Sequence, residues 1–144
     1  MTLEHEIVIE RPLDEVFAFV TDPANAPRWQ SGVLSTTKTS DEPMGAGVRW
    51  REVRTFLGRR VEGTLEATEY DPDRLFALRS VSGTVAIEVR HLFETFDGGT
   101  RIRVLAEGDA GRLGRLGGRF VRRAAERQLK GDLARLKQLL ETRP

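Results

Sequence analysis

The hydrophobic pattern of the chain changes near residue 118, and this change limits most strongly what the chain can fold into. From Val121 to Leu140 the apolar residues recur at helical spacing on one side of a helix, and charged residues occupy the opposite side. The apolar set is Val121, Ala125, Leu129, Leu133, Leu136, Leu139 and Leu140, and the charged set is Arg123, Arg127, Lys130, Lys137 and Glu141. The sequence therefore predicts one long amphipathic C-terminal helix whose apolar stripe needs a large apolar partner.

Four glycines precede this helix, namely Gly111, Gly114, Gly117 and Gly118. Each lowers helix propensity by about 1 kcal/mol relative to alanine. We therefore expect the start of the helix to be loose or bent.

The preceding part of the chain is typical of strands. Segments rich in β-branched and aromatic residues predict strands at 6–10, 33–39, 48–56, 61–70, 75–81, 84–96 and 100–107. Glycine-containing turns join several consecutive strands as hairpins, so the sheet should be antiparallel. Between the first two strands, residues 13–20 have helical spacing after Arg11-Pro12, and residues 22–29 predict a short helix or an ordered loop.

Composition narrows the class of protein. At 144 residues, without a repeat or linker, the chain is expected to form a single domain over 1–144. The absence of cysteine excludes disulfides and cysteine nucleophiles, and His5 and His91 are too far apart in sequence to predict a metal site; no cofactor is predicted either. A net charge of +1 argues against nucleic-acid binding, and the N-terminus lacks the pattern of a secretory signal, so a cytoplasmic location is expected.

These elements predict an α+β fold in which a curved antiparallel sheet of about seven strands is covered by the long helix. The sheet has one apolar face, and the helix is the only large element that can bury it. A strongly twisted sheet need not contact the helix along its whole length, so an apolar cavity is expected where the two diverge.

Several motifs resemble those of a known family. They are Ile7-Val8-Ile9-Glu10-Arg11-Pro12, Val16-Phe17-Ala18-Phe19-Val20, Pro27-Arg28-Trp29, Gly45-x-Gly47, Glu69-Tyr70-Asp71-Pro72 and Gly98-Gly99-Thr100-Arg101. With the leucine-rich last helix, they make the whole chain similar to the START-like (SRPBCC) superfamily, which includes polyketide cyclase and dehydratase-like proteins and Bet v 1-type proteins. The resemblance implies a helix-grip fold with two short helices after strand one and a small-molecule cavity.

Strand alternation selects the residues that should face this cavity. Trp50 shares a face with Val48, whereas Arg49 and Arg51 occupy the other face, so Trp50 should point inward. Trp29 is either a hydrophobic peg for its own loop or a residue at the cavity border, as the resemblance implies. The predicted ligand-binding residues are Trp29, Trp50, Phe56, Leu65, Phe76, Leu78, Val89, His91, Phe93, Phe120 and Val121.

Three polar residues are candidates for chemistry, and no catalytic residue is assigned among them. His91 is in phase with the apolar face and is a satisfied core histidine, a ligand contact or a proton-transfer group. Glu52 is in phase with Trp50, which we interpret as a sign of a β-bulge in this strand rather than as a buried carboxylate with a purpose. Arg79 should point outward.

A basic segment precedes and overlaps the last helix. Arg115, Arg119 and Arg123 fall on one side, which is interpreted as a solvated face; peripheral contact with an anionic membrane or an acidic partner is the alternative. Arg122 points toward the apolar stripe and is expected to form a buried pair.

Three functions remain open. The first is binding or transport of a small hydrophobic ligand such as a lipid, quinone or polyketide. The second is a cyclase or dehydratase-like enzyme that uses proton transfer inside the cavity, for which His91 and Glu52 are the candidates. The third is a membrane- or protein-interaction regulator that uses the basic segment. No hydrolase, phosphate-binding or metalloprotease motif is present.

Overall fold

The fold is seen in a computed structural model, which describes residues 1–83, 85–109 and 117–143. The N-terminal elements are β1 (Thr2–Ile9), α1 (Leu13–Val20), the short 3-10 helix η1 (Pro23–Asn25) and α2 (Ala26–Trp29). The following strands are β2 (Val33–Lys38), β3 (Arg49–Phe56), β4 (Arg59–Asp71), β5 (Leu75–Gly83), β6 (Ala86–Phe96) and β7 (Gly99–Asp109), and the last helix is α3 (Gly118–Glu141). The element order predicted from the sequence is confirmed, and most strands are longer than predicted.

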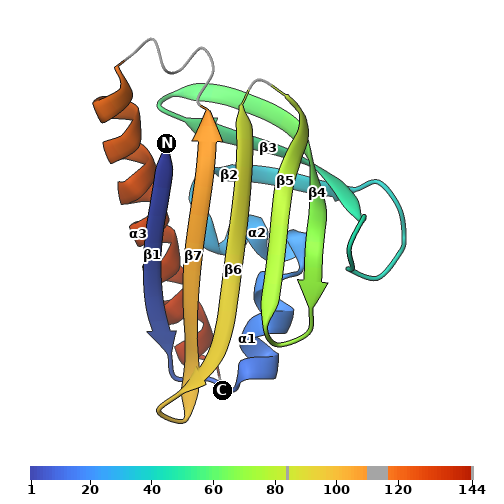
Figure 1. Cartoon of the computed structure of the whole chain (residues 1–144), viewed down its shortest axis with the longest axis vertical. Helices are drawn as coiled ribbons and strands as arrows, with labels where there is room; N and C mark the ends of the chain where they lie inside the picture. Colours follow the sequence, from blue (N-terminus) through green and yellow to red (C-terminus); the bar gives the residue numbers. More distant parts are fainter. Residues whose placement is uncertain (84, 110–116, 144) are drawn as a thin grey trace.

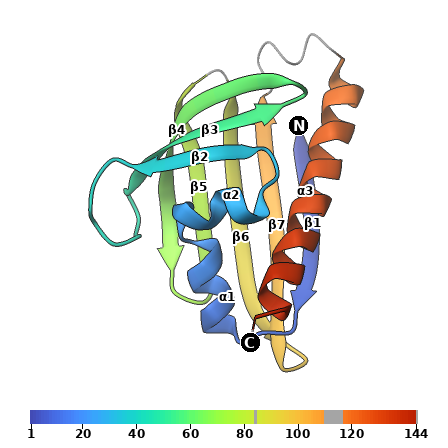
Figure 2. The ribbon, with the colours of Figure 1, turned by 180° about the vertical axis from the view of Figure 1, so that it is seen from behind.

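The seven strands form one antiparallel sheet in the order β1-β7-β6-β5-β4-β3-β2. The first and last strands are thus neighbours, and the other neighbours are joined in sequence order. The sheet curls, so that β2 and β3 run across the direction of β6 and β7 (Figure 1). Helices α1, α2 and α3 all lie on its concave side (Figure 2). This is the α+β helix-grip architecture expected from the sequence.

Irregular pairing allows the sheet to curl. The register of β4 against β5 shifts twice, between Thr64 and Leu65 and between Ala67 and Glu69. Close to the first shift, Gly63 faces Gly83, and a Cβ on Gly63 would lie 2.5 Å from the Ser82 carbonyl oxygen. Bulges increase local twist, and these two glycines permit the close approach of the strands.

The bulge expected on β3 at Glu52 is absent. The pairing of β3 with β4 is continuous from Arg49 to Phe56, and the nearby irregularity lies instead on β2, between Val33 and Ser35. Trp50, Glu52 and Phe56 therefore keep one phase, and Glu52 is a partly buried carboxylate on the inner face. The physical reason is that an ion pair satisfies this carboxylate in place, as described below.

The prediction for Arg122 was also wrong. Its side chain is exposed, and its Nη1 donates to the Thr2 carbonyl oxygen at 2.8 Å. The long arginine side chain reaches the start of β1 along the helix surface, so its charge stays in solvent and no buried partner is needed.

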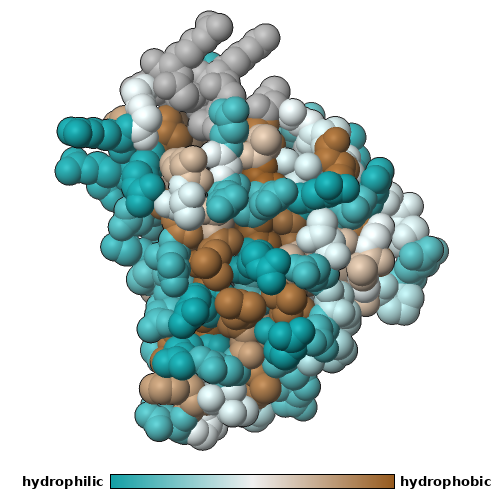
Figure 3. Space-filling model, in the orientation of Figure 1, coloured by the Kyte–Doolittle hydropathy of each residue, from teal (hydrophilic) through white to brown (hydrophobic). Residues whose placement is uncertain are grey.

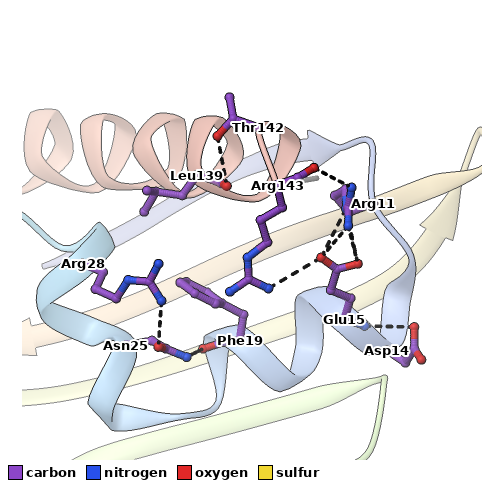
Figure 4. Close-up of polar contacts among 9 residues, drawn as sticks. All are labelled: Arg11, Asp14, Glu15, Phe19, Asn25, Arg28, Leu139, Thr142 and Arg143. Atoms are coloured by element: carbon purple, nitrogen blue, oxygen red, sulfur yellow. Dashed lines mark hydrogen bonds and ion pairs between the residues drawn. The ribbon is translucent and has the colours of Figure 1, made fainter.

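The end of the molecule that carries the C-terminus is closed by a polar cluster, which we call the clasp: Arg11, Glu15 and Arg143 (Figure 4). Arg11 donates to both carboxylate oxygens of Glu15, and its Nη1 donates to the Arg143 carbonyl oxygen at 3.3 Å. Arg143 lies 3.6 Å from Glu15, and its guanidinium lies 4.8 Å from the centre of the Phe19 ring. These contacts join the C-terminal end of α3 to α1.

The convex face of the sheet is mixed. Figure 3 shows apolar side chains between hydrophilic ones across this face. Many of its arginines pair with glutamates on other strands: Arg49 on β3 pairs with Glu66 on the adjacent β4, and Arg90 on β6 reaches across β5 to Glu69 on β4. Arg79 is exposed and lies 3.5 Å from Glu66, so it points outward as predicted and away from the concave side.

Candidate ligand cavity

A cavity of about 260 Å³ lies between the concave face of the sheet, α2 and the N-terminal half of α3. Its walls come from the beginning of β1, the inner faces of β3 to β7, and helices α2 and α3. They are mainly apolar, and include Leu3, Val20, Ala26, Trp29, Trp50, Phe56, Val61, Leu65, Phe76, Leu78, Val85, Ile87, Val89, Val104, Ala106, Val121, Ala125, Leu129 and Leu133. The cavity forms because α3 diverges from the curled sheet at this end, as the pattern of the sequence predicts.

Nine of the eleven residues selected from the sequence line this cavity: Trp29, Trp50, Phe56, Leu65, Phe76, Leu78, Val89, His91 and Val121. The other two lie elsewhere. Phe93 is buried at the closed end, where its ring meets that of Phe17 edge-on at 4.9 Å. Phe120 is 56% exposed on α3 and does not line the cavity, because its direction on the helix is about 100° from that of Val121.

His91 projects into the cavity from β6 and is 6% exposed. Its ring lies between those of Phe76 and Phe93, at centroid distances of 5.7 and 6.5 Å. The ring nitrogen Nδ1 lies 3.0 Å from the Phe76 carbonyl oxygen, and because a carbonyl can only accept, Nδ1 is the protonated nitrogen.

The charge state of His91 follows from its surroundings. Burial lowers the pKa of His91 to about 4, against a smaller opposing effect of the hydrogen bond to Phe76. The imidazole is therefore neutral at pH 7, and Nε2 carries a lone pair. Nε2 has no hydrogen-bond partner among the described residues, so it is a free acceptor.

A second polar group lies on the wall formed by β3. Arg54 and Glu52 are two residues apart and face the cavity together, and the Arg54 Nε donates to Glu52 at 2.9 Å. The Arg54 Nη2 donates to the Gln30 side-chain oxygen at 3.0 Å, at the end of α2. All three side chains are partly exposed, so this polar wall is reached by solvent while His91 is buried.

Asp132 is the polar residue that α3 contributes. It is buried, and its Oδ1 accepts hydrogen bonds from both the backbone nitrogen and the hydroxyl of Ser31, at 3.0 and 3.1 Å. Burial raises the pKa of Asp132, and the Ser31 hydrogen bonds and the charges of Arg54 and Arg135 oppose that effect. Asp132 thus fastens the connection between α2 and β2 to the long helix, and its carboxylate lines the cavity.

Trp29 contributes an unusual donor. Its indole nitrogen Nε1 is the one fully buried side-chain nitrogen or oxygen without a hydrogen-bond partner in the part of the chain that the structure describes. An unpaired buried donor costs free energy, on the order of 1–3 kcal/mol. Trp29 also lines the cavity.

The sequence analysis missed Gln30, Arg54 and Asp132. Arg54 could have been found, because it shares the period-2 phase of Trp50 and Phe56. Asp132 could also have been found, since it interrupts the apolar stripe of α3 beside Leu133. No sequence pattern could have placed Gln30 at the cavity, because its position depends on the path of the chain after α2.

The polar residues of the cavity do not form a metal site. Within the three described ranges, no group of three or more histidine and acidic side chains could hold a metal ion. No helix in these ranges is both long and apolar enough to cross a membrane.

The fold and the internal cavity define the class of the protein: it is a helix-grip protein of the Bet v 1-like, or START-like, superfamily. The family described as "Polyketide cyclase / dehydrase and lipid transport" matches residues 1–141, and the chain belongs to this family. No curated protein matches the sequence.

Solved structures with the same fold include proteins of diverse origin. TTHA0849 from Thermus thermophilus has a TM-score of 0.85 at 21% identity, with coverage of 99% of this chain and 100% of that one. The Zhui aromatase/cyclase from Streptomyces sp. R1128 has a TM-score of 0.81 at 18% identity, with coverage of 98% and 93%. Ara h 8.0201 has a TM-score of 0.74 at 14% identity and 99% coverage of each chain. At these identities the likeness shows the shared fold.

Proposed function

We propose that the protein binds a small, mostly apolar molecule in the cavity between α3 and the sheet. The observation that carries this proposal is a cavity of about 260 Å³ whose walls are mainly aromatic and aliphatic, with polar side chains interspersed among them. Small-molecule sites typically combine these two features, since apolar walls supply affinity and a few polar atoms fix orientation.

The polar atom that His91 presents to the cavity specifies part of the ligand. Because His91 is neutral with Nδ1 occupied, Nε2 can only accept a hydrogen bond. The group that reaches it should be a neutral donor such as a hydroxyl, since a carboxylate there would be desolvated without a donor from His91. A more polar part of the ligand fits the partly exposed wall of Gln30, Glu52 and Arg54.

Three aromatic probes of similar shape test this chemistry: 1-naphthol, naphthalene and 1-naphthoate. Titration of the purified protein, followed by tryptophan fluorescence, should rank 1-naphthol first and 1-naphthoate last. His91→Phe should weaken 1-naphthol binding about fivefold, the effect of losing one neutral hydrogen bond, and leave naphthalene binding unchanged. Equal binding of all three probes would contradict the assigned role of His91.

A blocking variant tests the cavity itself. Ala125→Trp places a large side chain in the cavity from α3 and should abolish binding of all three probes. Ala134→Trp is the matched control, because Ala134 is exposed on the same helix. Probe binding that survives Ala125→Trp in a folded protein would rule out this cavity as the site. Separately, native mass spectrometry of the wild-type protein as purified shows whether a cellular compound is bound.

A second candidate function is proton-transfer chemistry, such as a cyclisation or dehydration. It is favoured by two groups that line the same cavity, a neutral His91 and an Asp132 whose pKa burial raises. A neutral imidazole is a base, and a carboxyl group with a raised pKa can act as an acid. If this function holds, a polyketide-type substrate should lose water in the presence of the protein, and His91→Phe and Asp132→Asn should each abolish that reaction while probe binding persists.

A further inference from the structure

The first three turns of α3 carry a row of exposed cations along the side of the helix that faces away from the sheet. Arg119, Arg123 and Arg127 are spaced four residues apart, so they lie above one another, and all three are exposed. The exposed ring of Phe120 borders this row, and we call these four residues the basic face. Hydrophilic side chains gather at the edge of the molecule over these turns (Figure 3).

The arginines of the basic face differ from those on the sheet. Arg79, Arg90 and Arg103 each lie within 4 Å of a glutamate carboxylate. By contrast, Arg119, Arg123 and Arg127 form no ion pair or hydrogen bond with any residue that the structure describes. The one acidic residue in these turns, Glu126, pairs with Lys130 at 3.2 Å. The positive charge of the basic face is therefore not neutralised within the described protein.

The basic face is also next to the cavity. Val121 follows Phe120 directly and lines the cavity, as does Ala125 between Arg123 and Arg127. The opposite wall at this end is formed by Phe56 and Val61, on either side of the turn between β3 and β4. In Figure 2 this end of α3 lies at the end of the molecule away from the C-terminus.

We propose that the basic face docks on an anionic lipid surface, with Phe120 inserted among the lipids beside the cavity. A helix with cations and an exposed aromatic ring is suited to the membrane interface, where anionic head groups neutralise the cations and the ring enters the acyl boundary. Docking in this position places the cavity walls of α3 close to the source of an apolar ligand. This inference goes beyond the proposed ligand binding and rests on different residues, so either can fail alone.

Sedimentation with vesicles tests the docking. The full chain should bind vesicles of phosphatidylcholine and phosphatidylserine, should not bind phosphatidylcholine alone, and should dissociate at about 0.5 M salt. The triple variant R119Q/R123Q/R127Q should weaken binding about 100-fold, since each cation near an anionic surface contributes about fivefold. The control R79Q/R90Q/R103Q removes the same charge from the sheet and should weaken binding by no more than about threefold.

A second pair of variants tests the contribution of the Phe120 ring to vesicle binding. Phe120→Ala should weaken vesicle binding about tenfold, the effect of losing one buried aromatic ring. Leu34→Ala, which truncates a residue 54% exposed on β2, should leave binding unchanged. Thermal unfolding curves and 1-naphthol titrations check that every variant is folded and keeps its cavity.

Three results would overturn the proposal: no binding of the wild type to anionic vesicles, equal losses in the two triple variants, or full binding by Phe120→Ala. If the wild type ignores vesicles but is retained on heparin, and R119Q/R123Q/R127Q is not, the basic face recognises another polyanion and membrane docking is rejected.

Discussion

The two halves of α3 differ in what they cover. The C-terminal half packs into a solid core, in which Leu136 and Leu140 have almost no exposed surface. The N-terminal half contributes one buried apolar residue, Val121, and otherwise faces the cavity or solvent. One helix therefore both closes the core and covers the site.

The polar contacts of the two ends follow the same division. At the closed end the clasp ties α3 to α1 through Arg11, Glu15 and Arg143. At the cavity end the described contact is a single hydrogen bond from Arg122 to the backbone of β1. The described contacts that hold α3 to the rest of the protein are therefore concentrated in its C-terminal half, whereas its N-terminal half lines the cavity.

The largest expected effect on stability comes from replacing one leucine in each half of α3. Leu136→Ala removes a fully buried side chain and should lower the free energy of unfolding by about 3 kcal/mol, because a cavity is created. Leu129→Ala enlarges a cavity that already exists, and should cost about 1 kcal/mol. Urea denaturation measures both. Equal losses would mean that the two halves do not differ in packing.

Protonation of His91 should lower the free energy of unfolding by a nearly equal amount at low pH. Its pKa is about 4 in the folded state and about 6.5 when unfolded, so the unfolded chain binds the proton more tightly. The resulting stability is present above pH 6.5 and is lost as the pH falls toward 4, by about 3 kcal/mol in total. His91→Phe should lack this loss. The check is the difference in unfolding free energy between the two proteins at pH 7 and pH 4.5, and parallel pH profiles would contradict the burial of a neutral imidazole.

Asp132 marks the boundary between the two halves and should have a smaller effect. Asp132→Ala leaves the Ser31 donors without an acceptor and should cost about 2 kcal/mol, whereas Asp132→Asn keeps an acceptor and should cost less. Because burial raises the folded pKa of Asp132, the folded state binds its proton more tightly than the unfolded state. Wild type should therefore gain stability relative to Asp132→Asn as the pH falls through that raised pKa and below the ordinary value of 3.8. Chemical denaturation across this range measures the difference, and the opposite trend would mean that the ionised form is preferred.

The same division explains what the sequence could predict. Period-2 alternation identified Trp50, Leu65 and Phe76 as inner-face residues, and helical spacing identified the stripe of α3. Such patterns report the direction of a side chain. They do not report how far apart two facing elements lie, so they could not separate Phe93, which is packed against Phe17, from Val89, which lines the cavity.

Polar residues were harder to predict because their partners are distant in sequence. Glu52 was interpreted as a bulge, since a lone carboxylate on an apolar face is unfavourable. Its partner Arg54 is two residues away, but the Gln30 oxygen that completes the group comes from the end of α2. Likewise Asp132 and Ser31 are 101 residues apart, and only the folded chain shows that they meet.

The smallest expected effect on stability concerns the clasp, and it measures how much the ion pairs at the closed end contribute to the free energy of unfolding. Glu15→Gln removes the carboxylate that Arg11 and Arg143 share, and should cost about 1 kcal/mol, because the group is partly exposed. Glu62→Gln, in a more exposed pair with Arg60, is the control and should cost almost nothing. Thermal unfolding at low and high salt measures both variants, and only the Glu15 variant should differ clearly from wild type. If both variants unfold like wild type, the clasp adds nothing to stability, and the difference between the two halves of α3 arises from apolar packing alone.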